Sequence, residues 1–546
     1  MRMGAFAAIW ISLAVAGGLG AAETARAAKA DPVVAAEFDD LALSVEGEAI
    51  RELLVHATAT DQRDGTILEA VRGFYKERDY EPVWMIDGKP SRQMRAMRRR
   101  MERAAQDGLD PAQYVPETLV VPGADTPIAT AAAEVSFSRS VARFVVHLGS
   151  GSVAPSSVSS IITLTPEMPD VPAALARLSR TAGIAASLKK IEPPHPQYAR
   201  LKATLRALRT ADATPEPVRV PEGKLLKKGV RDARVSLLRT RLAAPSASGE
   251  DDLFDADLAT TVAAFQASQG LADDGVAGPR TLAALNGPDR EADIAAAAAN
   301  MERWRWMPRD LGDFHVLVNV PEFVVRVFSD GEEVHQTRVV VGKPANATPT
   351  FSHAIDHLVV NPYWNVPTSI VTKEMIPEIR GSGGNYFSRQ GYQVFAQVGG
   401  RSYQVDPGRI DWNRVNPRAV RIRQVPGERN ALGRIKFMFP NQHSVYLHDT
   451  PSKRLFQRDE RALSHGCVRV DEPLAFADAL LPYAAPEWNS VRLKKLYGGK
   501  ERRINLDRPV PVHLAYFSMR IEADGTIRRF QDVYGYDRKM QKTPEA

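Results

Sequence analysis

The spacing of apolar residues changes once along this 546-residue chain, near Trp306. Before that point, apolar residues recur at helical intervals, as they do across residues 94–101 and 137–148. After it come short β-branched runs within residues 315–341, two of them separated by Asp330-Gly331, which is a strong hairpin signal. The pattern predicts a multidomain α and β chain, with helical parts first and a mainly antiparallel β domain after them.

Length and charge set broad limits on what the chain can be. A mass of 60.0 kDa with 44% hydrophobic residues is enough for several cores at about 150 residues per domain. The net charge of +6 is modest for this length, and short basic clusters such as Arg98-Arg99-Arg100 are typical of solvated helix faces. We therefore expect no nucleic-acid partner.

The first residues have the order of an export signal: Arg2, an apolar run over residues 5–19, and then small residues suited to cleavage. The run is short for a membrane span, although an uncleaved anchor is the alternative. No later segment is apolar enough to cross a bilayer, so the mature chain is expected not to span a membrane.

Composition shifts divide the rest of the chain. A linker rich in alanine, threonine and proline follows the first helical region, and a later stretch of glycines and aromatics interrupts the strand pattern in the manner of a functional insertion. The predicted boundaries are a signal peptide at 1–28, a helical scaffold domain at 35–210, a three-helix module at 221–287, a β domain at 311–500 with an inserted lid at about 373–434, and a C-terminal extension at 501–546 that packs on the β domain.

The only cysteine, Cys467, lies in Ser464-His465-Gly466-Cys467-Val468-Arg469 and cannot form an internal disulfide. In an oxidising compartment such a thiol is either buried and inert or reactive. A thiol of ordinary pKa, about 8.5, needs a nearby base to become nucleophilic. We predict that the base is His448, which ends an expected strand at 443–447 and precedes Cys467 by 19 residues; His465 is the alternative.

The residues around Cys467 also suit the binding of a substrate. The amides of Gly466 and Cys467 could donate to a developing oxyanion, since glycine allows close backbone approach. Arg469 shares a face with Cys467 if this stretch is extended, where it would either grip a substrate carboxylate or form a structural ion pair. A zinc site is not favoured, because neither a CxxC pair nor a HExxH helix is present.

These motifs resemble those of two cell-wall families. His448 and the segment 464–469 are similar to the catalytic signature of the bacterial L,D-transpeptidases (YkuD type), and the similarity extends over about 311–537. The three-helix module resembles a peptidoglycan-binding module in its Phe265-Gln266, Asp274-Gly275 and Gly278-Pro279 pairs. With the helical region and lid, the arrangement is similar to the large periplasmic members that carry a scaffold domain and a capping insertion.

The resemblance implies a periplasmic, carbapenem-sensitive transferase of cell-wall biogenesis and cell shape that needs no cofactor. Cys467 would form a thioester with a donor tetrapeptide stem and release D-alanine, His448 would carry the proton, and an amine of a second stem would complete a 3-3 cross-link. A backbone carbonyl orients the histidine in the family, and here that position is Asp449, whose side chain could add to or replace the role. Substrate and oxyanion contacts are expected from Tyr446, Ser464, His465, Gly466 and Arg469.

The acceptor stays open at this stage. Water would make the protein a carboxypeptidase, and a protein amine would make it a transferase that anchors an outer-membrane protein. A non-catalytic peptidoglycan-binding protein is a further alternative. The expected partners are stem peptides and glycan, together with proteins of cell-wall synthesis.

Overall fold

The computed structural model describes residues 43–115, 126–210, 218–221, 223–246, 249–269, 271–287, 289–382 and 386–542. The predicted signal peptide lies outside these residues. Over the described ranges, no helix combines the length and apolar character that a membrane span requires. Four hydrophobic cores are present within them: one in the helical N-terminal part, one in the small module, one in the β domain and one in its insertion. The predicted fold class is confirmed.

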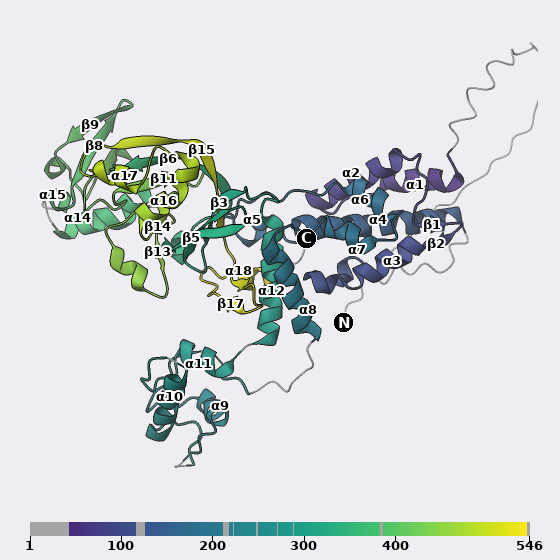
Figure 1. Ribbon diagram of the computed structural model, residues 1–546, viewed down its shortest axis with the longest axis horizontal. Coiled ribbons are helices and arrows are strands. Elements are labelled where there is room, and N and C mark those ends of the chain that lie inside the picture. The colour runs from purple at the N-terminus through teal and green to yellow at the C-terminus, as the bar shows by residue number, and fades with distance from the viewer. Residues whose placement is uncertain are drawn as a thin grey trace, which may run out of the picture.

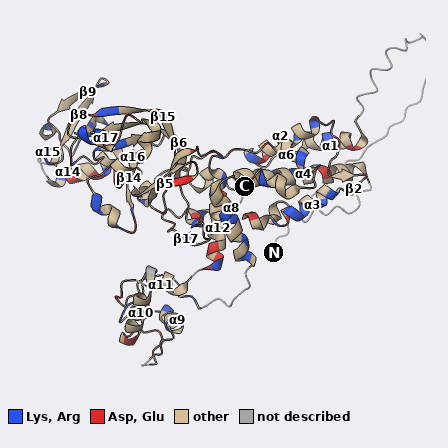
Figure 2. Cartoon of the chain, viewed as in Figure 1, with Lys and Arg blue, Asp and Glu red and all other residues tan. Residues whose placement is uncertain are grey.

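The N-terminal part packs around one long helix, α4 (Pro127–Ser150) (Figure 1). The helix begins where the Thr126 side chain accepts a hydrogen bond from the Ala129 amide at 3.2 Å, and Phe137 and Phe144 on its apolar stripe are fully buried. The other elements are α1 (Val45–His56), α2 (Gln62–Lys76), β1 (Met85–Ile86), β2 (Lys89–Pro90), α3 (Arg92–Met101), η1 (Ala104–Asp107), η2 (Pro111–Gln113), α5 (Pro155–Val158), α6 (Val171–Leu178) and α7 (Ile184–Lys189). Basic and acidic residues are interspersed along these helices (Figure 2).

The small module comprises α9 (Ala233–Leu242), α10 (Ala256–Ser268) and α11 (Pro279–Asn286), and it forms a separate lobe in Figure 1. A buried glutamine lies beside its hydrophobic core: Nε2 of Gln266 donates to Thr281 Oγ1 at 3.0 Å and to Asp274 Oδ1 at 2.9 Å. The Gly275 amide in turn donates to Gln266 Oε1. These residues therefore hold the turn and the third helix together.

Helices α8 (Pro196–Thr210) and α12 (Arg290–Trp306) pack on each other and share the core of the β domain. The scaffold was expected to extend to residue 210, yet the buried face of α8, which includes Tyr198 and Leu205, belongs to this second core. A parallel bridge between Ile162 and Thr350 adds a main-chain connection between the two parts. The helical and β parts are thus continuous in packing.

Nine described strands form the main sheet, in the order β13-β5-β14-β12-β11-β6-β15-β3-β4. Because β4 also pairs with β5, the sheet closes on itself. Most neighbours are antiparallel, while β12–β14, β13–β5 and β15–β3 are parallel. The strands are β3 (Phe314–Asn319), β4 (Val324–Ser329), β5 (Glu332–Gly342), β6 (Phe351–Val360), β11 (Ile435–Met438), β12 (Leu447–His448), β13 (Ala462–Ser464), β14 (Val468–Val470) and β15 (Arg502–Ala515).

Two strand predictions need correction. The segment 501–546 was expected to pack on the β domain as an extension, but its β15 lies inside the sheet between β6 and β3. The strand expected at 443–447 is reduced to β12, because Ser444 has φ +55° and the Asn441 side chain bonds the Val445 backbone, which makes residues 441–445 a turn.

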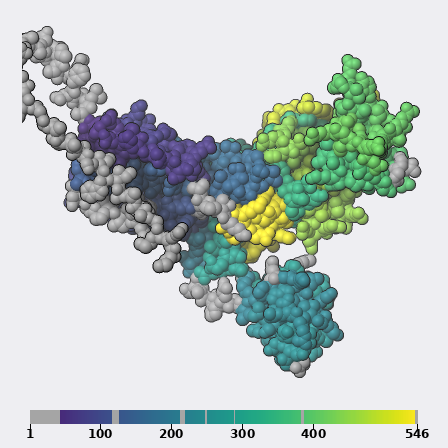
Figure 3. Space-filling view, turned by 180° about the vertical axis from the view of Figure 1, so that it is seen from behind, coloured from purple at the N-terminus to yellow at the C-terminus, as the bar shows by residue number. Residues whose placement is uncertain are grey.

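The remaining elements surround the sheet. The C-terminal residues lie between the helical part and the lid-bearing part in the space-filling view (Figure 3), where Arg303 pairs with Asp537 at 2.6 Å. These elements are η4 (Pro344–Asn346), η8 (Lys453–Gln457), α16 (Pro473–Ala484), α17 (Ser490–Lys495), β16 (Met519–Ile521), β17 (Ile527–Arg529) and α18 (Tyr536–Lys542).

The insertion is a folded subdomain with its own core and its own four-stranded sheet, ordered β7-β10-β8-β9. Its strands were not predicted, because aromatics and glycines obscure their alternation. The elements are β7 (Trp364–Asn365), α13 (Thr368–Ile370), the π-helical turn η5 (Val371–Met375), α14 (Ile376–Ser382), α15 (Tyr386–Gln390), β8 (Tyr392–Val398), β9 (Arg401–Val405), η6 (Pro407–Arg409), η7 (Pro417–Ala419) and β10 (Val420–Gln424).

Candidate active site

The pairing of β12 with β14 brings the two predicted catalytic residues to one face of the sheet. The strands run parallel, with Leu447 opposite Val468 and His448 opposite Arg469. Leu447 and Val468 are fully buried in the core. Since side chains alternate along a strand, His448 and Arg469 point to the opposite face.

Tyr446 and Cys467 precede this pair and share the same face. The Val468 amide donates to the Tyr446 carbonyl at 3.1 Å, which extends the register by one residue and sets Tyr446 beside Cys467. The Tyr446 ring lies 5.6 Å from the His448 ring, measured between centroids. Tyr446, His448, Cys467 and Arg469 therefore form one cluster.

His448 is held by the main chain. Its ring is only 4% exposed, and Nδ1 lies 2.5 Å from the carbonyl oxygen of Asp449. A carbonyl can only accept, so Nδ1 carries the proton and Nε2 keeps its lone pair. Burial, with a further contribution from the positive charge of Arg469, lowers the pKa of His448 to about 3. The imidazole is thus a neutral base at neutral pH.

Cys467 is half-buried, and its sulfur lies 4.0 Å from the Ser444 carbonyl oxygen. Burial raises the pKa of the Cys467 thiol, while Tyr446 and the charge of Arg469 act in the opposite direction. The resting pair is consequently a thiol beside a neutral imidazole. A thiol in this state becomes a strong nucleophile only when a base takes its proton, and the Nε2 lone pair of His448 is such a base.

Ser464 fixes the turn that carries the thiol. Its hydroxyl donates to the Cys467 carbonyl at 2.6 Å and accepts from the Gly466 amide at 3.1 Å. Gly466 has φ +114°, a region that side chains rarely adopt. The Gly466 amide, predicted as an oxyanion donor, is therefore engaged by Ser464 in this structure. Among the described residues the Cys467 amide has no acceptor, so it remains available.

The Asp449 carboxylate does not contact His448. Its two oxygens accept from the Arg434 amide at 2.8 Å and the Thr450 amide at 2.7 Å, and it pairs with Lys453. A Cβ on Gly433 would lie 2.3 Å from this carboxylate, so only glycine fits there. The orienting group is the Asp449 carbonyl, and the side chain instead stabilises the neighbouring loop.

His465, the alternative base, points toward the lid. Its Nε2 lies 2.5 Å from Glu374 in η5, and Lys343 lies 3.8 Å from the same carboxylate. This cluster joins the residue two positions before the thiol to the insertion. The geometry gives His465 a contact with the lid and leaves His448 on the face that carries Cys467.

Arg469 has no acidic partner among the described residues, and its Nε is buried without a hydrogen bond. Its row continues to Lys436 on β11, which pairs directly with His448. The Lys436 ammonium lies 5.6 Å from the centre of the Tyr446 ring and also lacks an acidic partner in the described part of the chain. Within that part, the structural ion pair considered for Arg469 is not formed.

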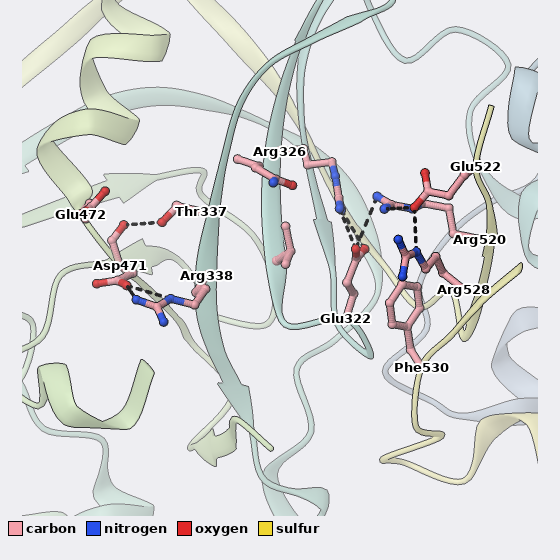
Figure 4. A pocket seen from close by; sticks show the side chains of 12 residues that line it. Glu322, Arg326, Thr337, Arg338, Asp471, Glu472, Arg520, Glu522, Arg528 and Phe530 are labelled. Carbon is pink, nitrogen blue, oxygen red and sulfur yellow. Dashed lines mark hydrogen bonds and ion pairs between the residues drawn. The ribbon is translucent and has the colours of Figure 1, made fainter. Parts of the chain in front are cut away.

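A charged cavity elsewhere in the β domain contains arginines that, unlike Arg469, are paired with carboxylates. It has a volume of about 540 Å³ and is lined by residues of β4, β5, β16 and β17 (Figure 4). Its arginines lie on carboxylates: Arg326 and Arg520 on Glu322, and Arg338 on Asp471 at 2.8 Å. Paired charges of this kind offer little to an ionic ligand, whereas the two cations beside His448 remain free to bind one.

Two residues that the sequence analysis did not single out support the thiol turn. Thr348 donates from Oγ1 to the Gly466 carbonyl at 2.8 Å and accepts from the Gly342 amide at 2.9 Å. The Tyr534 hydroxyl donates to the Gly342 carbonyl at 2.7 Å and accepts from the Thr348 amide. The resemblance over about 311–537 includes both segments, but it did not show that they touch.

In the described ranges, no group of three or more histidine, cysteine, aspartate or glutamate side chains is arranged to hold a metal ion. A half-buried thiol and a neutral histidine, whose Nδ1–H is held by a main-chain carbonyl while Nε2 stays free, define the site as a cysteine–histidine pair of the kind used in nucleophilic catalysis.

Comparison with known families places this pair. Residues 313–495 match the family model of the L,D-transpeptidase catalytic domain, residues 231–285 that of a putative peptidoglycan binding domain, and residues 69–205 that of a scaffold domain. The chain therefore carries an L,D-transpeptidase catalytic domain of the YkuD type together with a scaffold domain and a peptidoglycan-binding domain.

Individual proteins are also similar to parts of this chain. A putative L,D-transpeptidase of Haemophilus influenzae is 36% identical over 249 residues, which is 44% of this chain and 48% of that protein. The match thus spans about half the length of that relative. Among solved structures, an L,D-transpeptidase from Mycobacterium smegmatis is 12% identical, with coverage of 37% of this chain and 58% of that one at a TM-score of 0.18. L,D-transpeptidase 3 from Mycobacterium tuberculosis, in complex with a faropenem-derived adduct, is 13% identical, with coverage of 37% and 60% at a TM-score of 0.18.

Proposed function

We propose that this protein is a cell-wall L,D-transpeptidase that forms 3-3 cross-links between peptidoglycan stems. One observation carries the proposal. The Asp449 carbonyl fixes the His448 ring through Nδ1 and so leaves Nε2 free on the face that presents Cys467. The catalytic-domain match and the name of the Haemophilus relative support the same reaction class.

The first half-reaction makes an acyl-enzyme. His448 Nε2 takes the thiol proton while Cys467 Sγ attacks the carbonyl of the L-centre of diaminopimelate in a tetrapeptide stem. The Cys467 amide donates to the oxyanion of the intermediate. The C–N bond then breaks, His448 returns the proton to the leaving amine, and D-alanine departs from the thioester.

The second half-reaction transfers the acyl group. A side-chain amine of another stem attacks the thioester carbonyl and loses a proton to His448, the C–S bond breaks, and the thiol is restored. Arg469, with no acid of the described chain on it, binds a donor carboxylate.

Location and partners follow from the same proposal. Export through the signal at residues 1–28 places the mature chain in the periplasm, where the module at 231–285 keeps it on the glycan network. Proteins of cell-wall synthesis are further partners under this proposal, and carbapenems are expected to acylate Cys467.

The test is mass spectrometry of disaccharide-tetrapeptides incubated with the purified mature chain. Wild type should give 3-3 dimers, and Cys467→Ala and His448→Ala should not, while His353→Ala, an exposed histidine, serves as a matched control. Tripeptide alone would identify a carboxypeptidase. Unchanged tetrapeptide with a carbapenem adduct on Cys467 would favour anchoring of a protein, and absence of both would favour a non-catalytic binding protein.

A further inference from the structure

Lys436 is a half-buried cation without a partner. Among the described residues no carboxylate or carbonyl accepts a hydrogen bond from its ammonium group, which lies 5.6 Å from the centre of the Tyr446 ring. Burial lowers the pKa of Lys436, which means that the charged form is poorly solvated. Such a group costs stability unless a ligand with negative charge compensates it.

The nearby acids are engaged elsewhere. Glu501, whose charge acts on Lys436, accepts the Tyr363 amide at 2.8 Å, and Asp449 is bound to Lys453 and two amides. Neither carboxylate forms an ion pair with Lys436 in the described chain. A carboxylate that approaches Lys436 would therefore come from a bound molecule.

The register places Lys436 at a defined distance from the reaction. Lys436, His448 and Arg469 form one row across β11, β12 and β14, and Cys467 stands on β14 with Arg469. Neighbouring strands are about 4.8 Å apart, so the backbone of Lys436 is about 10 Å from that of the thiol strand. Arg469 is thus the near cation and Lys436 the far one.

A donor with two carboxylates matches this spacing. The carboxylate of the leaving residue is only a few bonds from the reacting carbonyl, so it would bind Arg469, the nearer cation. The far cation suits an acid at the end of a long side chain of the acyl residue. We propose that Lys436 is a specificity-determining residue that selects acyl donors with a free side-chain carboxylate, an inference that rests on the proposed function.

The experiment compares two tetrapeptide donors that differ only in this group, one with the free diaminopimelate carboxylate and one with it amidated. Wild type should form acyl-enzyme about tenfold or more faster from the free acid at low donor concentration, in line with a charge-assisted hydrogen bond. Lys436→Met should lose this preference: its KM for the free acid should rise, while its kcat should change little. Lys494→Met, an exposed lysine, should keep it.

The outcomes separate the two proposals. If wild type uses both donors equally, or if Lys436→Met still discriminates as wild type does, the role of Lys436 is overturned while the transpeptidase assignment stands. If neither donor acylates wild type, both fail. Alkylation of Cys467 by iodoacetamide and the thermal unfolding temperature show whether the variant is folded with an intact thiol site.

Discussion

The carbonyl oxygen of Asp449 lies 2.5 Å from Nδ1 of His448. A main-chain group thus sets the tautomer of His448, and the adjacent carboxylate binds the neighbouring loop instead. The contact adds no full negative charge beside the ring, which agrees with a histidine that stays neutral next to Arg469.

Replacement of Asp449 by alanine should leave the orientation of His448 intact, because the carbonyl is retained. We expect acylation of Cys467 by a carbapenem to stay within a few-fold of wild type, whereas His448→Ala should lose about 10²–10⁴-fold. The free energy of unfolding of Asp449→Ala should fall by about 1–3 kcal/mol, because the Arg434 amide loses its acceptor. Mass spectrometry and thermal unfolding measure the two effects. An Asp449→Ala protein as slow as His448→Ala would contradict this division of roles.

The pH dependence of thiol alkylation should report the pKa of Cys467. Burial raises this pKa, so the rate with iodoacetamide should reach its midpoint above the ordinary value of about 8.5. No inflection is expected between pH 5 and 7, because His448 is already neutral above about pH 3. Arg469→Gln removes a charge that stabilises the thiolate and should move the midpoint to higher pH, while Arg421→Gln in the lid should not. A midpoint near pH 6 in wild type would indicate a thiolate–imidazolium pair instead.

Glu374→Gln should loosen the lid. His465 and Lys343 both lie on the Glu374 carboxylate, and the π-helical turn that carries it is a geometry frequent at functional sites. Amide hydrogen exchange over residues 371–375 should become faster than in wild type. Lys373→Gln alters the neighbouring residue without touching the pair and should leave exchange unchanged. Equal exchange in wild type and Glu374→Gln would show that the contact does not hold the lid.

Arg305→Ala should strongly destabilise the junction between the helical and β parts. The guanidinium is fully buried and binds Glu302 at 2.9 Å and the Tyr198 hydroxyl at 3.0 Å. Loss of one partner of a buried pair costs about 3–5 kcal/mol, because the other charge is left uncompensated. Arg231→Ala breaks an exposed pair in the small module and should cost much less, because solvent screens exposed charges. Denaturant unfolding compares the two, and equal losses would refute the role of the buried network.

Local signals in the sequence predicted local structure well. The apolar stripe of α4 is buried as its spacing indicates, and Asp330 and Gly331 both adopt positive φ, as the hairpin requires. The alternation of Cys467 and Arg469 also predicted their shared face.

Contacts between distant segments were not predictable in the same way. Thr348 and Gly466 are 118 residues apart, and Gly342 and Tyr534 are 192 apart, so no periodicity links them. Lys436 lies opposite His448 because β11 pairs with β12. This pairing was not predictable, because the turn at residues 441–445 shortens the strand that ends at His448. The interior position of β15 likewise depends on its pairing with two strands that are distant in sequence, β6 and β3.

The place of β15 also sets an order of assembly. Residues 502–515 are synthesised after the nucleophile, yet they fill the gap between β6 and β3. Until they arrive, two long strands expose unpaired edges and the ring of strands stays open. A growing chain therefore carries its thiol for some time without a finished support for it. A chain interrupted before Arg502 would hold His448 and Cys467 but no closed sheet to position them.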